Sequence, residues 1–292
     1  MKICAIVVTY NRLTLLKDCI KALLEQTHPI NEIIVVNNDS TDGTKEWLDE
    51  NSAQLKVIHQ GNLGGAGGFY TGVKYAYNQN YDWMWLMDDD VQPTQDCLEN
   101  LLKYDSEEIG ILQPIRKFEN KYVIFECRYL DLINARKELH QNFIDEKDIG
   151  TEPIDIKTVP FEGPLIKKEV IDKIGFPNKD YFIFYDDTDF SYRTSLVSKT
   201  IKLIPKAVLL KKLLPKHDCE SLSWRKKYEI RNCTYFDRVY GENYRVKFLR
   251  PLIRTTRYIK YCINHCQDFT IFKGLKMYKY TFDGLWGKMG KY

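Results

Sequence analysis

The chain has 292 residues, of which 44% are hydrophobic and 28% are charged. These fractions are ordinary for a soluble globular protein, and the length allows one large domain with an appendage or two smaller domains. The net charge of +3 conceals a strongly basic C-terminal end, but no DNA- or RNA-binding motif accompanies that charge, so the sequence argues against nucleic acid as a partner.

The hydrophobic pattern also argues against a secreted or membrane-spanning protein. The apolar run near the N-terminus, residues 3–8, is too short for the apolar region of a signal peptide. No stretch approaches the roughly eighteen apolar residues of a membrane span. The eight cysteines show neither a CxxC pair nor a metal-ligand spacing, as expected of reduced thiols. The sequence therefore predicts a cytosolic protein that is able to lie on a membrane surface.

Short apolar runs alternate with helical patterns over residues 1–90. We expect strands at 3–8, 33–36, 55–58 and 83–87, with helices between them. Strands that alternate with helices of about ten to fifteen residues are typical of βαβ units and a parallel sheet. The predicted fold class is therefore α/β with a mostly parallel central sheet. Because such sheets bind ligands at the carboxyl ends of their strands, the polar residues after these runs are candidate site residues.

Two polar stretches between the strands suit a nucleotide. Asp39 follows the second predicted strand, where an acid commonly binds a nucleoside hydroxyl or base edge. Helix capping is the alternative; we favour the nucleotide for Asp39 and capping for residues 40–42. The glycine-rich stretch at 61–69 lacks the GxGxxG and P-loop signatures. Its glycines still allow a ligand to approach the backbone closely near a helix start.

Three consecutive acids, Asp88, Asp89 and Asp90, end the fourth predicted strand. Their mutual repulsion is costly unless a positive group binds there. A divalent cation that also binds phosphate oxygens would meet this need. The alternative is a solvated acidic turn that caps the next helix. The triplet alone does not decide between these two interpretations.

The region between this triplet and residue 180 is less regular. We expect a strand at 109–115, an irregular polar region at 116–158, a short strand within 161–166, and a helix at 167–174 that Gly175 ends. The irregular region is a natural place for loops that set specificity.

A second acidic cluster follows an aromatic run and comprises Asp186, Asp187 and Asp189. Asp189 and Arg193 are four residues apart, as in a structural ion pair on a helix. Two acidic clusters favour a site in which one holds a metal and the other supplies a general base. Beside them His217 is a candidate third metal ligand, although a lone histidine is more often structural.

Basic residues dominate the C-terminal part. Residues 225–227 and Arg231 mark a basic helix that suits a diphosphate or an anionic acceptor, or that is simply an exposed basic face. Farther on, apolar residues between 249 and 263 keep helical spacing, with Arg250, Arg254 and Arg257 on a different face. We expect this helix to lie on anionic lipid; the alternative is an ordinary packed helix whose basic side faces water.

The order of the motifs resembles glycosyltransferase family 2. The motifs cover residues 1 to about 235 and are IVVTYNR, VVNNDSTDGT, GNLGGAGGF, WLMDDDV, GPLIKKEVIDKIG, YDDTDFSYR, and HDCES followed by YEIRN. The resemblance implies a Rossmann-like GT-A fold, a nucleotide-diphosphate sugar donor, and a divalent metal, Mn²⁺ or Mg²⁺, held by a DXD-type motif. We accordingly expect a GT-A catalytic domain at 1–240 and a basic helical segment at 241–292.

Position by position, the resemblance assigns a base, metal ligands and donor contacts. Asp187 matches the catalytic base. The metal ligands it implies are Asp90, Asp88 (shared with the ribose) and His217. Thr9, Tyr10, Arg12 and Asp39 match nucleotide contacts. The full nucleotide- and donor-binding set that we predict adds Asn62, Gly64, Gly65, Asp88 and Asp89. The neighbourhood of acceptor and donor is predicted to contain Gly163, Asp186, Trp224 and Arg231.

Within the family, these motifs look most like those of bacterial galactofuranosyltransferases, with rhamnosyltransferases next. We expect an inverting, single-addition enzyme that moves galactofuranose from UDP-galactofuranose onto a hydroxyl of a lipid-linked saccharide. We expect this enzyme to act in cell-surface polysaccharide synthesis, in the cytoplasm at the inner face of the bacterial plasma membrane. The alternatives are a dTDP-rhamnose-dependent rhamnosyltransferase and a non-catalytic protein that binds sugar nucleotides or glycans. A nucleotidyltransferase is disfavoured because TYNR offers only Arg12 as a basic residue; a homo-oligomer is left open.

Overall fold

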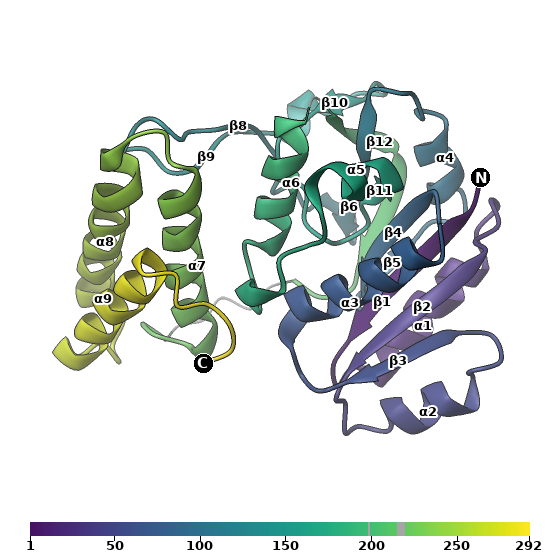
Figure 1. The fold of residues 1–292 in the computed structure, drawn as a ribbon, viewed down its shortest axis with the longest axis horizontal. Helices are drawn as coiled ribbons and strands as arrows, with labels where there is room; N and C mark the ends of the chain where they lie inside the picture. Colours follow the sequence, from purple (N-terminus) through teal and green to yellow (C-terminus); the bar gives the residue numbers. More distant parts are fainter. Residues whose placement is uncertain (198, 215–219) are drawn as a thin grey trace. The chain divides into compact units, whose positions relative to one another are not determined.

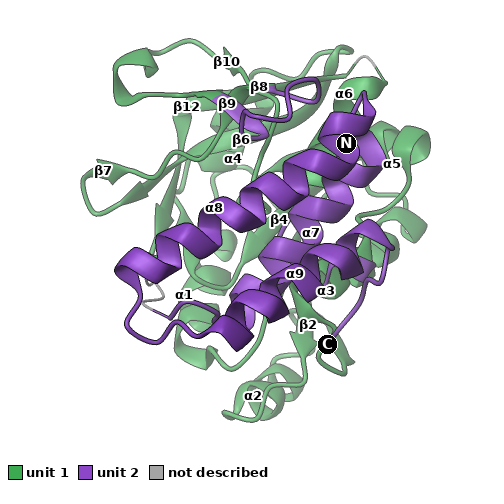
Figure 2. Ribbon diagram, turned by 90° about the vertical axis from the view of Figure 1, so that its left-hand side faces the viewer, with its two compact units in different colours: residues 1–129, 142–179, 187–214 green, residues 130–141, 180–186, 215–292 purple. Residues whose placement is uncertain are grey.

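A computed structural model of the chain describes residues 1–197, 199–214 and 220–292. The described chain divides into two compact units (Figure 2). Unit 1 comprises Met1–Tyr129, Asn142–Lys179 and Asp187–Leu214, and unit 2 comprises Leu130–Gln141, Asp180–Asp186 and the described part of 215–292. The chain therefore passes between the units several times. The division into a catalytic domain at 1–240 and a basic helical segment at 241–292 stays a prediction.

Unit 1 is built on a sheet with the strand order β10-β12-β6-β11-β4-β1-β2-β3 (Figure 1). The first four strands of the chain run parallel, as do β6 and β12, whereas β11 is antiparallel to both of its neighbours. The strands are β1 (Ile3–Thr9), β2 (Glu32–Asn38), β3 (Lys56–Gln60), β4 (Trp83–Asp88), β5 (Val91–Pro93), β6 (Ile109–Phe118), β7 (Lys121–Tyr122), β10 (Ile154–Asp155), β11 (Leu165–Lys167) and β12 (Thr200–Lys211). A separate pair is formed by β8 (Cys127–Leu130) and β9 (His140–Phe143). The predicted α/β class with a mostly parallel central sheet is confirmed.

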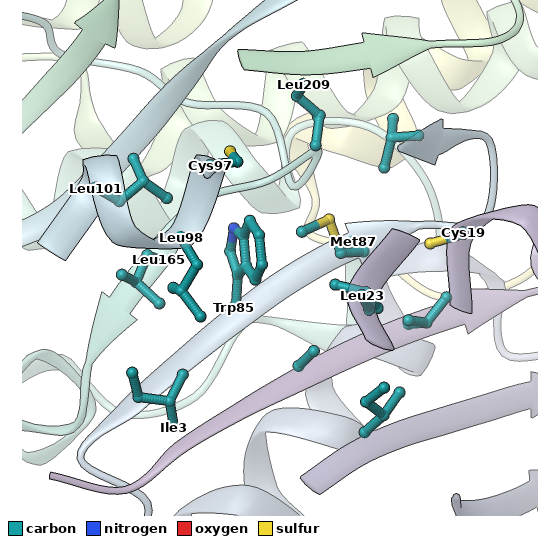
Figure 3. Close-up of a cluster of buried hydrophobic side chains, with 14 of the residues drawn as sticks. Ile3, Cys19, Leu23, Trp85, Met87, Cys97, Leu98, Leu101, Leu165 and Leu209 are labelled. Carbon is teal, nitrogen blue, oxygen red and sulfur yellow. The ribbon is translucent and has the colours of Figure 1, made fainter. Parts of the chain in front are cut away.

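Helices cover both faces of this sheet because its central strands are apolar on both sides. On one face, side chains from two helices pack around Trp85 and Met87 (Figure 3). On the other face, Ile6 and Leu86 contribute to a second cluster that includes Phe190. The helices of unit 1 are α1 (Leu13–Leu24), α2 (Thr44–Glu50), α3 (Gly64–Asn78), α4 (Cys97–Leu102), α5 (Lys168–Ile174) and most of α6 (Asp186–Leu196).

Helix α3 packs closely on β1 because glycines face the sheet. A Cβ atom on Gly72 would overlap the Ile6 side chain, and one on Gly68 would overlap another side chain of β1. Gly65, in the first turn of α3, has open space where a Cβ would lie. Gly68 of the glycine-rich stretch, and Gly72 after it, therefore serve helix–sheet packing. The close approach of a ligand to the backbone stays a prediction, now for the first turn of α3.

Unit 2 contains three helices that pack on one another around Ile230, Cys262 and Met277. They are α7 (Trp224–Tyr240), α8 (Arg250–His265) and α9 (Ile271–Leu285), and a π-helical turn at Arg245–Leu249 leads into α8. In the ranges that the structure describes, no helix is long and apolar enough to cross a membrane.

Two of the arginines predicted to face lipid are instead used inside unit 2. Arg250 is 2% exposed and donates through Nη2 to Asp237 Oδ1 at 2.5 Å. Arg254 Nη2 donates to Asp237 Oδ2 at 2.6 Å. Arg257 lies nearer the surface, 3.6 Å from Glu138. The predicted basic face of α8 is therefore wrong, because the buried carboxylate of Asp237 binds two of its three guanidinium groups.

Candidate active site

The acidic triplet lies at the carboxyl end of β4, in the interior of the sheet. Asp88 is the last residue of β4, between β1 and β11, and Asp89 and Asp90 form the turn into β5. The side chains of Asp89 and Asp90 are buried, with 3% and 6% exposed. A solvated acidic cap is therefore the wrong interpretation of the triplet, because buried carboxylates require partners.

Asp89 has protein partners for both of its oxygens. Thr9 Oγ1 donates to Asp89 Oδ2 at 2.8 Å, and Arg12 Nη1 donates to Asp89 Oδ1 at 3.0 Å. Burial raises the pKa of Asp89, and the charge of Arg12 opposes that rise. Thr9 and Arg12, both predicted to contact the nucleotide, thus connect the end of β1 to the end of β4. Contacts of these residues with a nucleotide stay predictions.

Asp90 carries a buried oxygen that is not satisfied. Its Oδ2 lies 3.5 Å from Arg12 Nη1, but its Oδ1 accepts no hydrogen bond from any described residue. Burial, followed by the charges of Asp90 and Glu162, raises the pKa of Asp88 well above its ordinary value. A buried carboxylate oxygen without a donor, beside a second carboxylate, is suited to a hard divalent cation. Asp88 and Asp90 are therefore candidate ligands of Mn²⁺ or Mg²⁺.

The structure describes two of the three predicted metal ligands, Asp88 and Asp90. His217 lies outside the described residues. Within the described ranges, no group of three or more His, Cys, Asp or Glu side chains is arranged to hold a metal ion. The complete set of ligands therefore stays a prediction.

A buried network of charges that the sequence analysis missed borders the triplet. Glu162 accepts hydrogen bonds from Arg116 Nη1 at 2.6 Å and from Lys211 Nζ at 2.5 Å. Arg116 also donates to Glu126 Oε1 at 3.0 Å, and Lys211 Nζ lies 3.8 Å from Asp90 Oδ1. Although burial acts in the other direction, Arg116 and Lys211 hold the pKa of Glu162 below its ordinary value. No local pattern reveals this network, since Glu162 is 46 and 49 positions from its two partners.

Asp187, the predicted base, lies in the first turn of α6 and is partly buried. Burial raises the pKa of Asp187 to about 6, against hydrogen bonds from the backbone N–H and the hydroxyl of Thr188 at 2.6 and 3.3 Å. The charge of Glu162 raises this pKa further, and that of Arg116 lowers it. A carboxyl group that titrates close to neutral pH is suited to accept a proton in a reaction.

The turn before α6 has an uncommon backbone. Positive φ angles of 66°, 65° and 70° occur at Phe182, Phe184 and Tyr185. Asn232 of α7 holds this turn within unit 2, because its Nδ2 donates at 3.0, 2.7 and 2.9 Å to the carbonyl oxygens of Tyr181, Ile183 and Phe184. The sequence motif YEIRN contains Asn232, but its role was not predicted, because it depends on a segment far away in the chain.

The other predicted donor-binding residues of unit 1 follow β1, β2 and β3. Tyr10 is exposed after β1, and Asp39 is exposed after β2 with a φ of 67°. At the start of α3, Asn62 Oδ1 accepts a hydrogen bond from Gly64 N at 3.0 Å, and Gly65 follows. Because β1, β2, β3 and β4 are parallel, these residues lie at the same edge of the sheet as the triplet.

The residues predicted near acceptor and donor are divided between the units. Gly163, in unit 1, has a φ of 95° and donates its N–H to the carbonyl oxygen of Leu86 at 2.8 Å, beside the triplet. Asp186 is buried and Trp224 is exposed, and both belong to unit 2. Arg231, also in unit 2, is 1% exposed and donates to backbone carbonyl oxygens. Their relation to an acceptor stays a prediction.

Comparisons with known proteins identify a family whose profile the chain matches and two kinds of similar protein. Residues 4–175 match the sequence profile of the family described as glycosyl transferase family 2. Galactofuranosyltransferase GlfT1 of Mycolicibacterium smegmatis is 37% identical over 196 residues, which cover 65% of this chain and 64% of that protein. The dTDP-rhamnosyl transferase RfbF of Shigella flexneri is 26% identical over 209 residues, which cover 69% and 66%. The match thus spans slightly less than two thirds of the galactofuranosyltransferase.

Solved structures resemble the fold over most of the chain. A mannosyltransferase from Pyrobaculum calidifontis, in complex with GDP-Man and Mn²⁺, has a TM-score of 0.60 at 13% identity, over 98% of this chain and 88% of that chain. GalNAc-T7 with UDP, GalNAc and Mn²⁺ has a TM-score of 0.60 at 13% identity, over 91% and 58%. At such identities the likeness shows the fold alone, and it agrees with the fold class predicted from the sequence.

Proposed function

Because the chain belongs to glycosyl transferase family 2 and has a GT-A fold, we propose that it transfers a sugar from a nucleotide diphosphate to an acceptor hydroxyl, with inversion at the anomeric carbon. The observation that carries the proposal is the presence, in unit 1, of two kinds of carboxylate: the triplet at the end of β4, and Asp187 with its pKa of about 6. The first suits a divalent cation, and the second suits proton transfer.

In this proposal Asp187 accepts the proton of the acceptor hydroxyl while the hydroxyl oxygen attacks the anomeric carbon and the bond to the diphosphate breaks. A pKa of about 6 leaves most of this carboxyl group ionised at neutral pH. Asp88 and Asp90 would hold Mn²⁺ or Mg²⁺, and His217, which lies outside the described residues, is the proposed third ligand. When bound, the cation supplies Lewis-acid stabilisation of the departing diphosphate, worth several kcal/mol. Thr9 and Arg12 fix Asp89 and thereby the loop after β1.

For the donor we propose UDP-galactofuranose, and for the acceptor a hydroxyl of a lipid-linked saccharide used in bacterial cell-surface polysaccharide synthesis. The likeness to a mycobacterial galactofuranosyltransferase supports this choice. The second candidate donor is dTDP-rhamnose, which the likeness to a rhamnosyl transferase supports.

Release of the nucleotide tests the proposal. The purified protein is incubated with Mn²⁺, a lipid-linked acceptor and each of the two donors. We expect acceptor-dependent release of UDP from UDP-galactofuranose, its loss in EDTA, and its return with excess Mn²⁺ or Mg²⁺. Release of dTDP from dTDP-rhamnose instead would change the donor. Transfer that survives EDTA would remove the metal from the mechanism, and donor binding without any transfer would favour a sugar-nucleotide-binding protein.

A lipid-linked acceptor requires a protein at a membrane surface, and we propose that α9 contacts anionic lipid on the cytoplasmic side. Exposed apolar side chains line one side of this helix, at Ile271, Phe272, Leu275 and Phe282, and Trp286 follows directly after its last residue. At 3.6 residues per turn they lie within about a third of the helix circumference. Lys276 and Lys279 are exposed on or beside this stripe. An apolar stripe with lysines is the pattern of a helix that lies in the interface of an anionic membrane.

Replacing Phe272 and Trp286 together by Ser is expected to weaken binding to phosphatidylglycerol vesicles at least about ten-fold, since each buried aromatic contributes about 1.5–3 kcal/mol. Vesicle co-sedimentation at low and high salt measures the effect. The control is Leu24→Ser, which removes an exposed apolar side chain from α1, in unit 1. Unchanged binding by the double variant, or weakening by the control, would reject α9 as the lipid contact.

A further inference from the structure

Lys211 lies near two acids but forms a hydrogen bond with only one of them. Its Nζ is 2.5 Å from Glu162 Oε1 and 3.8 Å from Asp90 Oδ1. Asp90 Oδ1 is buried and accepts no hydrogen bond from a described residue, although an ammonium group is so near. Lys211 is itself 6% exposed, so its charge is held inside the protein. The ammonium group is thus adjacent to the unsatisfied oxygen without satisfying it.

Glu162 is able to hold Lys211 because Arg116 fixes the other oxygen of the same carboxylate. Arg116 Nη1 donates to Glu162 Oε2 at 2.6 Å, and Arg116 Nη2 donates to Glu126 Oε1 at 3.0 Å. Arg116 is 1% exposed. Buried charges tolerate desolvation only when strong hydrogen bonds pair them in good geometry. The hydrogen bond that holds the Lys211 ammonium group is therefore supported by Arg116, whereas its ion pair with Asp90 is longer, at 3.8 Å.

We propose that Glu162, supported by Arg116, holds the Lys211 ammonium group away from Asp90 and thereby keeps Asp90 Oδ1 open to a divalent cation. This inference rests on the metal site of the proposed function. Glu162 and Lys211 are positioning residues, since they act through Asp90. Without the charge of Glu162, Asp90 becomes the nearest anion for Lys211, and an ammonium group on Asp90 competes with the divalent cation.

Binding of Mn²⁺ alone, without nucleotide, tests the inference, with free Mn²⁺ measured by electron paramagnetic resonance. Glu162→Gln is expected to weaken Mn²⁺ binding about ten-fold, because Lys211 turns to Asp90. Lys211→Met is expected to bind Mn²⁺ as tightly as the wild type or up to about ten-fold more tightly, because a competing cation is gone. In the double variant the loss caused by Glu162→Gln should disappear, since no ammonium group remains.

Glu126→Gln is the matched control for loss of negative charge. Glu126 is 1% exposed and accepts a hydrogen bond from Arg116, as Glu162 does, but it is not bonded to Lys211. Its substitution should weaken Mn²⁺ binding less than Glu162→Gln does, because Glu126 reaches Lys211 only through Arg116 and Glu162. Lys167→Met is the control for loss of a buried lysine, because Lys167 is 9% exposed and lies 2.6 Å from Asp105. Circular dichroism and thermal unfolding show which variants are folded.

The outcomes separate this inference from the proposed function. If the wild type does not bind Mn²⁺, the proposed metal site falls and the inference falls with it. If the wild type binds Mn²⁺ and Glu162→Gln binds it equally well, only the inference is overturned. The same holds if Glu162→Gln weakens Mn²⁺ binding as much in the Lys211→Met background as it does in the wild type. If Glu162→Gln does not fold, Lys211→Met decides, and weaker Mn²⁺ binding by that variant overturns the inference.

Discussion

Asp187→Asn is expected to reduce the rate of sugar transfer about a hundred- to ten-thousand-fold while donor binding stays nearly unchanged. The amide has the same shape but cannot accept the proton of the acceptor hydroxyl, and a positioned general base contributes a rate factor of this size. Steady-state kinetics measures the rate, and calorimetry with the nucleotide sugar measures donor binding.

Asp155→Asn is the control for this substitution. Asp155 belongs to the same unit, and its exposed carboxylate lies 3.1 Å from Lys202 on the surface. We expect wild-type kinetics from it, because exposed ion pairs contribute little. A transfer rate for Asp187→Asn close to that of the wild type would show that another group is the base.

The same carboxyl group gives the expected pH dependence. The kcat/KM of the wild type should rise with pH through about 6, as Asp187 loses its proton, and then level off. Stability should change in the opposite direction. Because the pKa is raised from 3.8 to about 6, the folded state binds this proton more tightly, so the stability it contributes is full below pH 3.8 and is lost as pH rises through about 6. Asp187→Asn should show neither effect.

Asp237→Ala is expected to lower the free energy of unfolding by about 3–5 kcal/mol. Asp237 is 0% exposed, and each of its oxygens accepts a hydrogen bond from a different arginine, Arg250 or Arg254. Removing the carboxylate leaves two guanidinium groups in the interior of unit 2 without their anion, which is the costly way to break a buried ion pair. Urea unfolding followed by circular dichroism at constant pH measures the loss.

Glu138→Ala is the matched control, because Glu138 lies 3.6 Å from Arg254 and from Arg257 with a side chain that is 61% exposed. Its loss should change the free energy of unfolding by no more than about 1 kcal/mol. If Asp237→Ala and Glu138→Ala lowered the free energy of unfolding by similar amounts, the buried ion pairs of Asp237 would not be what stabilises unit 2.

Strands that are apolar on both faces were predicted well, because burial on both sides leaves an unbroken run in the sequence. The strands expected at 3–8 and 83–87 are Ile3–Thr9 and Trp83–Asp88 in the structure, each one residue longer at the end that carries the site. The predicted pair between Asp189 and Arg193 is confirmed at 2.8 Å, since the geometry of neighbours on a helix is local.

Structural features that depend on residues far apart in the sequence were not predicted. Strand β12 (Thr200–Lys211) was missed. Its residues alternate in burial at both ends, but the alternation is interrupted near Ile204, where the register with β6 shifts. The network at Glu162 was missed with it, since β12 carries Lys211. In the same way, the helical spacing of Arg250 relative to the apolar residues predicted that it faces outward. In the structure its guanidinium group is buried, because it binds Asp237, 13 positions earlier on another helix. Local periodicity contains no information about such partners.

The buried charges around the triplet do not balance, and this has a consequence for the valence of the ion. Counted as ionised, the acids exceed the bases by two; the acids are Asp88, Asp89, Asp90, Glu126 and Glu162, and the bases are Arg12, Arg116 and Lys211. Asp187, which is mostly ionised at neutral pH, adds a third negative charge near this cluster. A divalent ion offsets more of this excess than a monovalent ion does. Because uncompensated charge is costly in a protein interior, the cluster favours an ion of charge +2 by its formal charge alone, before any ligand geometry is considered.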